Sequence, residues 1–260
     1  MILRSLLSAL GVACVCFTAP AHAEEAGSGD VDPEALALLR AMAEEIASAE
    51  RLSVPIEVAY EVLQEGGEIL EFGGRRTVTL RRPDGLWVEN ERRDGERGGI
   101  VFDGKRVVFF DTDEHVYAAV DRPGDVDAAI DFVQARLDTP VPLGELLDRD
   151  AVATIVDAVE KGEIVGVDTI AGVSCHHLAF RNDAVDFQAW IQREGRPLLH
   201  RVVIVYREDE GAPRFSASFG SWDFSPSIPD GAFVFEPGPE DERIPVVVPK
   251  ALVTAGEESE

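Results

Sequence analysis

The residues best suited to chemistry lie in one segment, Gly172 to Arg181, with the sequence GVSCHHLAFR. Within it, Cys175 is followed directly by His176 and His177. A thiolate and imidazole nitrogens are preferred zinc ligands, and a histidine beside a cysteine can activate it as a nucleophile. The segment therefore raises two chemical hypotheses, a metal site and a reactive thiol.

The alternative is that this segment is a structural β-strand. Because side chains alternate along a strand, Cys175 and His177 would then lie on one face and His176 on the other. A zinc site needs three or four ligands, and the other histidines after residue 23 are isolated in the sequence. We interpret the segment as structural and assign no catalytic residue, cofactor or metal. A metal or thiol enzyme at Cys175 and His177 stays as a third hypothesis for the function.

Motifs for other chemistry are missing from the sequence. It contains no Gly-x-Ser-x-Gly elbow, no glycine-rich phosphate loop, no His-Glu-x-x-His and no Cys-x-x-Cys. With 49 acidic against 24 basic residues, the formal net charge is −25. Such a field repels phosphate backbones, so we expect no nucleic-acid partner.

The first residues predict export. Arg4 precedes an apolar run and then TAPAHA, which fits a signal peptide at 1–23 with cleavage after Ala23, followed by a polar linker at 24–31. No later segment reaches the ~18 apolar residues of a membrane helix, so we expect a periplasmic protein without a transmembrane segment. Cleavage would also remove Cys14 and Cys16, leaving Cys175 without a disulfide partner in the chain.

The elements that must position any site follow from periodicity. Asp32 as N-cap and Pro33 at the first position predict a helix to about residue 50, with apolar residues at spacings of three and four. Residues 56–120 then alternate with period two, broken by turns such as Asp103-Gly104. Two amphipathic helical patches follow, and strand patterns resume at residue 163. This order predicts an α+β fold with a curled antiparallel sheet and helices inserted between its two strand groups.

The order of motifs resembles a known superfamily. RRPDGLWVENERRDG at 81–95, followed by IVFDGKRVVFFDTDEHVYAAV at 100–120, is similar to the bacterial LolA/LolB-like lipoprotein carriers. Residues 172–206, from GVSCHHLAFR to VVIVY, resemble the second half of a related family of predicted periplasmic proteins of unknown function. The resemblance covers about residues 34–236.

The resemblance implies a single LolA-like domain at 32–236, a half-open β-barrel with an N-terminal helix and a helical lid over an apolar cavity. An acidic, proline-rich tail at 237–260 would follow. We expect a non-catalytic periplasmic carrier that holds a lipid or the acyl chains of a protein. The alternative is a sensor or binding module of the same fold that recognises a periplasmic protein partner. The candidate cavity residues are Val58, Tyr60, Val78, Leu80, Val88, Phe110, Ile130, Val133, Val203, Val205, Phe215 and Phe219.

Overall fold

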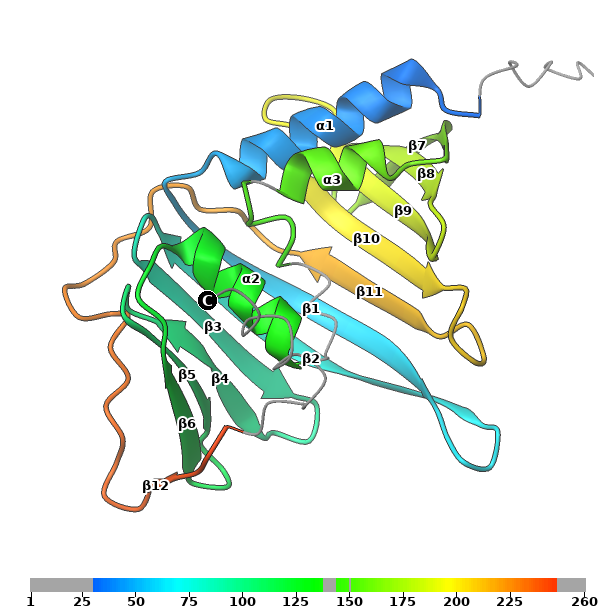
Figure 1. The fold of residues 1–260 in the computed structure, drawn as a ribbon. Helices are drawn as coiled ribbons and strands as arrows, with labels where there is room; N and C mark the ends of the chain where they lie inside the picture. Colours follow the sequence, from blue (N-terminus) through cyan, green and yellow to red (C-terminus); the bar gives the residue numbers. More distant parts are fainter. Residues whose placement is uncertain (1–29, 138–143, 150, 247–260) are drawn as a thin grey trace, which may run out of the picture.

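The computed structural model describes residues 30–137, 144–149 and 151–246 (Figure 1). The predicted signal peptide lies outside the described residues. The described residues form three helices and twelve strands: α1 (Pro33–Ala47), β1 (Arg51–Leu63), β2 (Ile69–Arg81), β3 (Gly85–Arg92), β4 (Arg97–Phe102), β5 (Arg106–Asp111), β6 (Val116–Asp121), α2 (Val126–Leu137), α3 (Ala151–Asp157), β7 (Lys161–Ile170), β8 (Val173–Arg181), β9 (Val185–Gln192), β10 (Leu199–Tyr206), β11 (Arg214–Phe219) and β12 (Glu242–Arg243).

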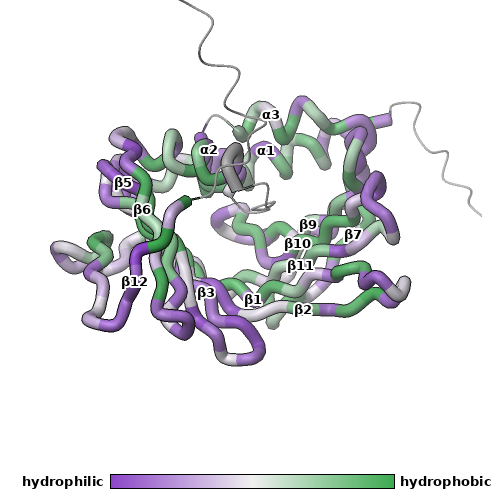
Figure 2. The backbone as a smooth tube through the Cα atoms, turned by 60° about the horizontal axis from the view of Figure 1, so that its bottom comes forward, coloured by the Kyte–Doolittle hydropathy of each residue, from purple (hydrophilic) through white to green (hydrophobic). Residues whose placement is uncertain are grey.

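All described strands belong to one sheet, in the order β12-β6-β5-β4-β3-β2-β1-β11-β10-β9-β8-β7. The first strand of the chain is therefore near the middle, with β2–β6 on one side and β11–β7 on the other. Neighbours are antiparallel, except that β12 runs parallel to β6. The end strands β7 and β12 do not pair with each other, so the sheet curls without closing (Figure 2). The predicted α+β class, with a curled, half-open sheet and helices between two strand groups, is confirmed.

Helix α1 begins as its sequence predicts and ends slightly earlier. The Asp32 carboxylate accepts a hydrogen bond from the Glu34 N–H at 2.8 Å, with Pro33 at the first helical position. The helix ends at Ala47 rather than near residue 50, where Ser48 caps it by donating its N–H to the Glu44 carbonyl. Its buried stripe packs against α3 and the second half of the sheet.

The main core lies on the concave face of the sheet. On β1, alternate residues Leu52, Val54, Ile56 and Val58 are buried, as the period-two pattern predicts. Helix α2 adds Val126, Ala129, Ile130 and Val133 to the same cluster. The helices lie across the opening of the curled sheet, with α2 over the first strand group and α1 and α3 over the second (Figure 1).

One buried arginine fastens the helices to the sheet. The Arg82 guanidinium, at the end of β2, donates Nη1 to Asp127 Oδ1 of α2 at 2.6 Å and Nε to the Ala49 carbonyl at 3.2 Å. Its Nη2 also donates to the carbonyl of Leu147, in the segment between α2 and α3. The Arg82 side chain is only 3% exposed. This residue thus joins the end of α1, the start of α2 and the segment that follows α2.

The C-terminal segment covers part of the convex face. Phe233 is buried with Val101 and Val108, and Phe235 stacks on Phe110 with ring centroids 5.2 Å apart. A Cβ atom at Gly85 would collide with the Phe233 ring, so this close approach requires glycine. Beyond it, β12 pairs with β6.

Of the tail predicted at 237–260, residues 237–246 are described, and Glu242–Arg243 among them pair with β6. Alternation in β3–β6 directs a second set of apolar side chains outward, and the C-terminal segment packs on that set.

We predict that Arg82→Met lowers the free energy of unfolding by about 3–5 kcal/mol, because the Asp127 carboxylate loses its buried partner. Urea denaturation followed by circular dichroism measures this loss. Arg75→Met is the control, since Arg75 forms an exposed ion pair with Glu57 and should leave the midpoint close to that of the wild type. Equal midpoints for all three proteins would contradict the role given to Arg82.

Candidate functional site

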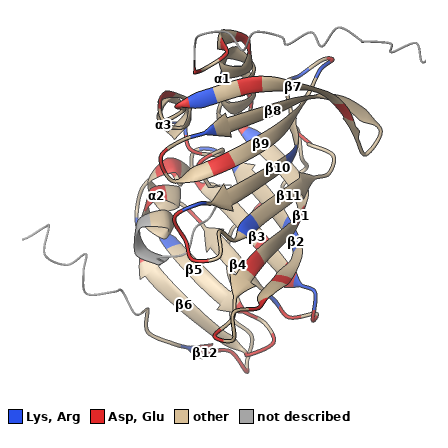
Figure 3. Cartoon of the chain, turned by 90° about the vertical axis from the view of Figure 1, so that its right-hand side faces the viewer, with Lys and Arg blue, Asp and Glu red and all other residues tan. Residues whose placement is uncertain are grey.

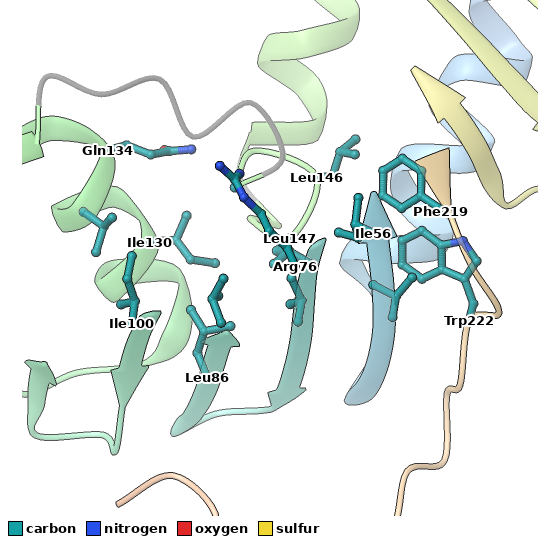
Figure 4. A pocket seen from close by; sticks show the side chains of 15 residues that line it. Ile56, Arg76, Leu86, Ile100, Ile130, Gln134, Leu146, Leu147, Phe219 and Trp222 are labelled. Atoms are coloured by element: carbon teal, nitrogen blue, oxygen red, sulfur yellow. The ribbon is translucent and has the colours of Figure 1, made fainter. Parts of the chain in front are cut away.

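Two adjoining cavities lie between the concave face and the described helices. The first, here called the α2 cavity, is narrow, with about 70 Å³ of free space for water-sized molecules. It lies between α2, the segment after α2 and strands β1–β4, with the end of β11 at its side (Figure 4). Its lining residues are Val54, Ile56, Arg76, Val78, Leu86, Val88, Ile100, Ile130, Val133, Gln134, Gly144, Leu146, Leu147, Phe219 and Trp222.

The second, here called the α3 cavity, lies under α1 and α3 against β9 and β10. Its free space is about 550 Å³, within the ~300–1,000 Å³ of typical small-molecule sites. Leu39 and Met42 of α1 and alternate residues of β9 and β10 supply apolar walls. Gln134 and Leu146 line both cavities, so the two spaces meet at these side chains.

The electrostatic character differs between the two cavities. The α2 cavity is apolar except for Arg76 and Gln134 among its lining residues, and burial lowers the pKa of the Arg76 guanidinium from its usual value. Asp131, Glu145 and Asp148 line the α3 cavity. Burial, with a further contribution from Asp148, raises the pKa of the Glu145 carboxyl. The cationic group therefore lines one cavity, and the acidic groups line the other.

The structure brings some of the twelve sequence-derived candidates together. Val78, Val88, Ile130, Val133 and Phe219 line the α2 cavity. Val58, Leu80 and Phe215 belong to the same concave core but do not line either cavity. Tyr60 lies further along β1, where it is 38% exposed and stacks on Phe72.

Phe110, Val203 and Val205 lie on the opposite, convex face, so their assignment to the cavity is wrong. Phe110 packs under the C-terminal segment, and Val203 packs with Cys175 and Trp190. Val205 alternates with Ile204, which lines the α3 cavity. These three residues lie in continuous apolar runs, Val107–Phe110 and Val202–Val205, where the sequence does not reveal which alternate set faces inward.

Sequence reasoning missed Arg76 and the segment at 144–147. Arg76 is two residues before Val78 on β2, and the same alternation that selects Val78 and Leu80 also places Arg76 on the concave face. Leu146 and Leu147 fall in the second predicted helical patch, but the structure has turns at 144–147 and begins α3 only at Ala151.

The strand that contains Cys175 has the alternation that its sequence predicts. Leu178 and Phe180 of β8 join the concave core, whereas Cys175 packs on the convex side. His177 has its Nδ1 3.2 Å from Asp168 Oδ2 and its Nε2 2.9 Å from Gln188 Oε1.

Neighbouring aromatic and buried groups complete this convex cluster. The His177 ring stacks on Trp190 at 4.3 Å, and Trp190 donates its Nε1–H to the same Asp168 oxygen at 2.8 Å. Cys175 is fully buried, and burial raises the pKa of its thiol. Within the described ranges, no group of three or more His, Cys, Asp or Glu residues is arranged to hold a metal ion.

The distribution of surface charge and the length of the helices are relevant to possible partners. Acidic and basic positions are interspersed over the strands in the side view of Figure 3, rather than gathered by sign. Among the described helices, none combines the length and apolarity that crossing a bilayer requires.

Several solved structures are similar to this chain. LprF from Mycobacterium bovis has a TM-score of 0.50 at 17% identity, over 77% of this chain and 98% of that one. LppX, a lipoprotein from Mycobacterium tuberculosis, has a TM-score of 0.49 at 16% identity, over 75% and 98% of the two chains. A LolA superfamily protein from Nitrosomonas europaea has a TM-score of 0.39 at 11% identity, over 77% and 97%. At these identities the likeness concerns the fold alone.

A comparison with curated proteins found no match. A family model described as "Predicted periplasmic protein (DUF2092)" matches residues 35–247, which include both strand groups and the helices between them. The predicted resemblance of residues 172–206 to a family of periplasmic proteins is thereby confirmed. This chain belongs to the DUF2092 family of periplasmic proteins.

Proposed function

We propose that this protein binds lipid in the periplasm and holds acyl chains in the two adjoining cavities, without catalysing a reaction. The observation that carries the proposal is the apolar concave surface that the helices cover only in part. In the α2 cavity almost every lining side chain is aliphatic or aromatic. Removing acyl chains from water onto such walls contributes about 25 cal/mol per Å².

The shape of the combined space suits an elongated ligand. The cavities meet at Leu146 and Gln134, so a chain that starts in one can continue into the other. The larger free space is under α3, whereas the α2 cavity is narrow and apolar. An acyl chain of a lipid or of an acylated protein is long and has a small cross-section, so it suits two connected cavities of which one is narrow.

The start of α2 and the end of α1 are each held by an arginine. Arg82 binds the start of α2, and Arg149 donates Nε to the Ala47 carbonyl at 3.3 Å and Nη2 to Glu50 Oε1 at 2.7 Å. We infer that α2 separates from the sheet at its C-terminal end when a chain enters. Helix α1 stays attached, because Asp30 and Asp32 before it form backbone hydrogen bonds with Gly162 of β7.

A second candidate function is a sensor that recognises a protein partner. The observation in its favour is the long β1–β2 ribbon, which projects beyond the neighbouring strands (Figure 1). Leu70 is 47% and Phe72 41% exposed on this ribbon, beside the exposed Val62 and Ile69. Apolar side chains gathered at such an edge are typical of an interaction surface.

The enzyme hypothesis at Cys175 and His177 has weaker support. A reactive thiol needs an accessible thiolate with a lowered pKa, whereas Cys175 is fully buried and its pKa is raised. Both nitrogens of His177 are next to protein oxygens, those of Asp168 and Gln188. These contacts favour a structural role for the cluster.

Protein purified from the periplasm tests the carrier directly. We expect native mass spectrometry to detect bound species, and organic extraction to release molecules that contain acyl chains. Consistently empty protein would contradict the carrier and favour the sensor.

We predict that Val88→Trp lowers the affinity for a fluorescent fatty-acid probe by about tenfold, because the indole fills space that chain methylenes would occupy. Probe titration measures the dissociation constant. Val167→Trp is the matched control, since Val167 is 54% exposed on β7 and lines neither cavity. Similar losses in both variants would argue against binding in the α2 cavity.

We predict that Cys175 resists Ellman's reagent at pH 8 in the folded protein and reacts rapidly in denaturant, because the thiol is buried and its pKa is raised. Absorbance at the reagent's product wavelength measures the reaction. Cys175→Ala should retain the affinity for the fatty-acid probe. Fast labelling of the folded protein would restore the thiol-enzyme hypothesis.

A further inference from the structure

Arg76 is a charged group in an otherwise apolar part of the α2 cavity. Its side chain extends from β2 into the space between Gln134 and Leu146 (Figure 4). On the sheet it is directly opposite Ile56 of β1 and Asn90 of β3. A guanidinium stays charged in proteins and presents five N–H donors, so its surroundings must supply acceptors.

The described residues supply Arg76 with no hydrogen-bond acceptor and no carboxylate partner. Other arginines of this region are paired: Arg75 forms its ion pair with Glu57, and Arg82 binds Asp127. Taking a cation out of water without a partner is costly. This cost would be recovered if the bound ligand brought an anion.

Asn90, which is opposite Arg76 on β3, also has a side-chain atom without a hydrogen-bond partner. Its Oδ1 is buried and has no hydrogen-bond partner among the described residues. The oxygen and nitrogen of an amide side chain exchange places when it turns by 180°. Asn90 can therefore present N–H donors on the strand next to Arg76, although it is not among the lining residues of either cavity.

We propose that the ligand is an anionic amphiphile whose carboxylate or phosphate oxygens bind Arg76, with Asn90 as an additional donor. The inference rests on the proposed lipid-binding function and adds the class of headgroup. Arginine binds such oxygens through two parallel N–H donors, and charge-assisted bonds of this kind are the stronger ones. The apolar walls beside Arg76, such as Ile56 and Val78, then receive the first part of the acyl chain.

The carboxyl groups that line the α3 cavity set the direction of the ligand. Asp131 and Glu145 line the α3 cavity, so an anionic headgroup there would face carboxyl groups. The chain therefore runs from Arg76 past Leu146 into the α3 cavity, with its methyl end among residues of β9 and β10. The net charge of −25 repels anions at long range, so any preference for them must come from this local contact.

The experiment compares a charged and a neutral form of one probe, cis-parinaric acid and its methyl ester, on the full chain after lipid extraction. The wild type should bind the acid about tenfold more tightly than the ester. Arg76→Leu should remove the preference, so that the acid and the ester bind with similar affinities. Arg75→Leu is the matched control, because this neighbouring side chain is exposed and should change neither affinity.

The outcomes separate this inference from the proposed function. Binding of neither probe would overturn the proposed function. Binding of both with equal affinity, or an acid preference that survives Arg76→Leu, would overturn the headgroup assignment and leave lipid binding intact.

Competition identifies the source of the anion. Displacement of the probe by palmitate more than by lysophosphatidic acid assigns a carboxylate, and the reverse order assigns a phosphate. Inorganic phosphate alone should not displace the probe. Displacement by inorganic phosphate would overturn the inference that the ligand is an amphiphile.

A measurement without ligand checks that Arg76 is not structural. If Arg76 lacks a protein partner, Arg76→Leu should leave the thermal midpoint of the empty protein unchanged or raise it, because it removes a buried charge. A midpoint that falls by about ten degrees or more would overturn the inference.

Discussion

The structure depends on one constraint: a large sheet that curls without closing has an apolar inner face that must be kept from water. The end strands β7 and β12 do not meet, so the strands alone cannot enclose that face. The helices lie across the opening and bury most of it. They are too short to fill the concavity, and the two cavities are the space that they leave. The candidate site thus results from the way in which the helices cover the apolar inner face of the sheet.

Two arginines near each other in the sequence show how differently one side-chain type can serve such a fold. Arg82 is surrounded by acceptors from α1, α2 and the segment after α2, so its charge stabilises the closed arrangement. Arg76 extends into the cavity with no protein acceptor among the described residues, and burial disfavours its charge. The first is a structural group whose replacement should destabilise the fold. The second has no such acceptor, which accords with the proposal that its partner arrives with a ligand.

Periodicity predicted the architecture well because the helical spacing of three and four residues and the strand period of two were both strong in this sequence. The Asp32-Pro33 start and the alternation in β1 specified a helix and a half-buried strand, and the strand at 173–181 divided Cys175 from Leu178 as expected. The site was predicted less well, for two physical reasons. Both faces of this sheet carry apolar clusters, so Phe110 and Val203 gave no sign that they point outward. Arg76 looked like an ordinary surface charge, because only the covering by α2 and the segment after it makes its position a buried one.

The central position of β1 also governs the order in which the molecule can assemble. Ile56 pairs with Phe219, so one edge of β1 stays open until β11, nearly the last strand, has emerged. Open strand edges are templates for pairing with other chains, and contacts between distant parts of a sequence form slowly. A chain that is completed from its N-terminus therefore presents half a sheet with an open edge on β1 until β11 follows. During that interval the open edge is a route to pairing with another chain and to aggregation.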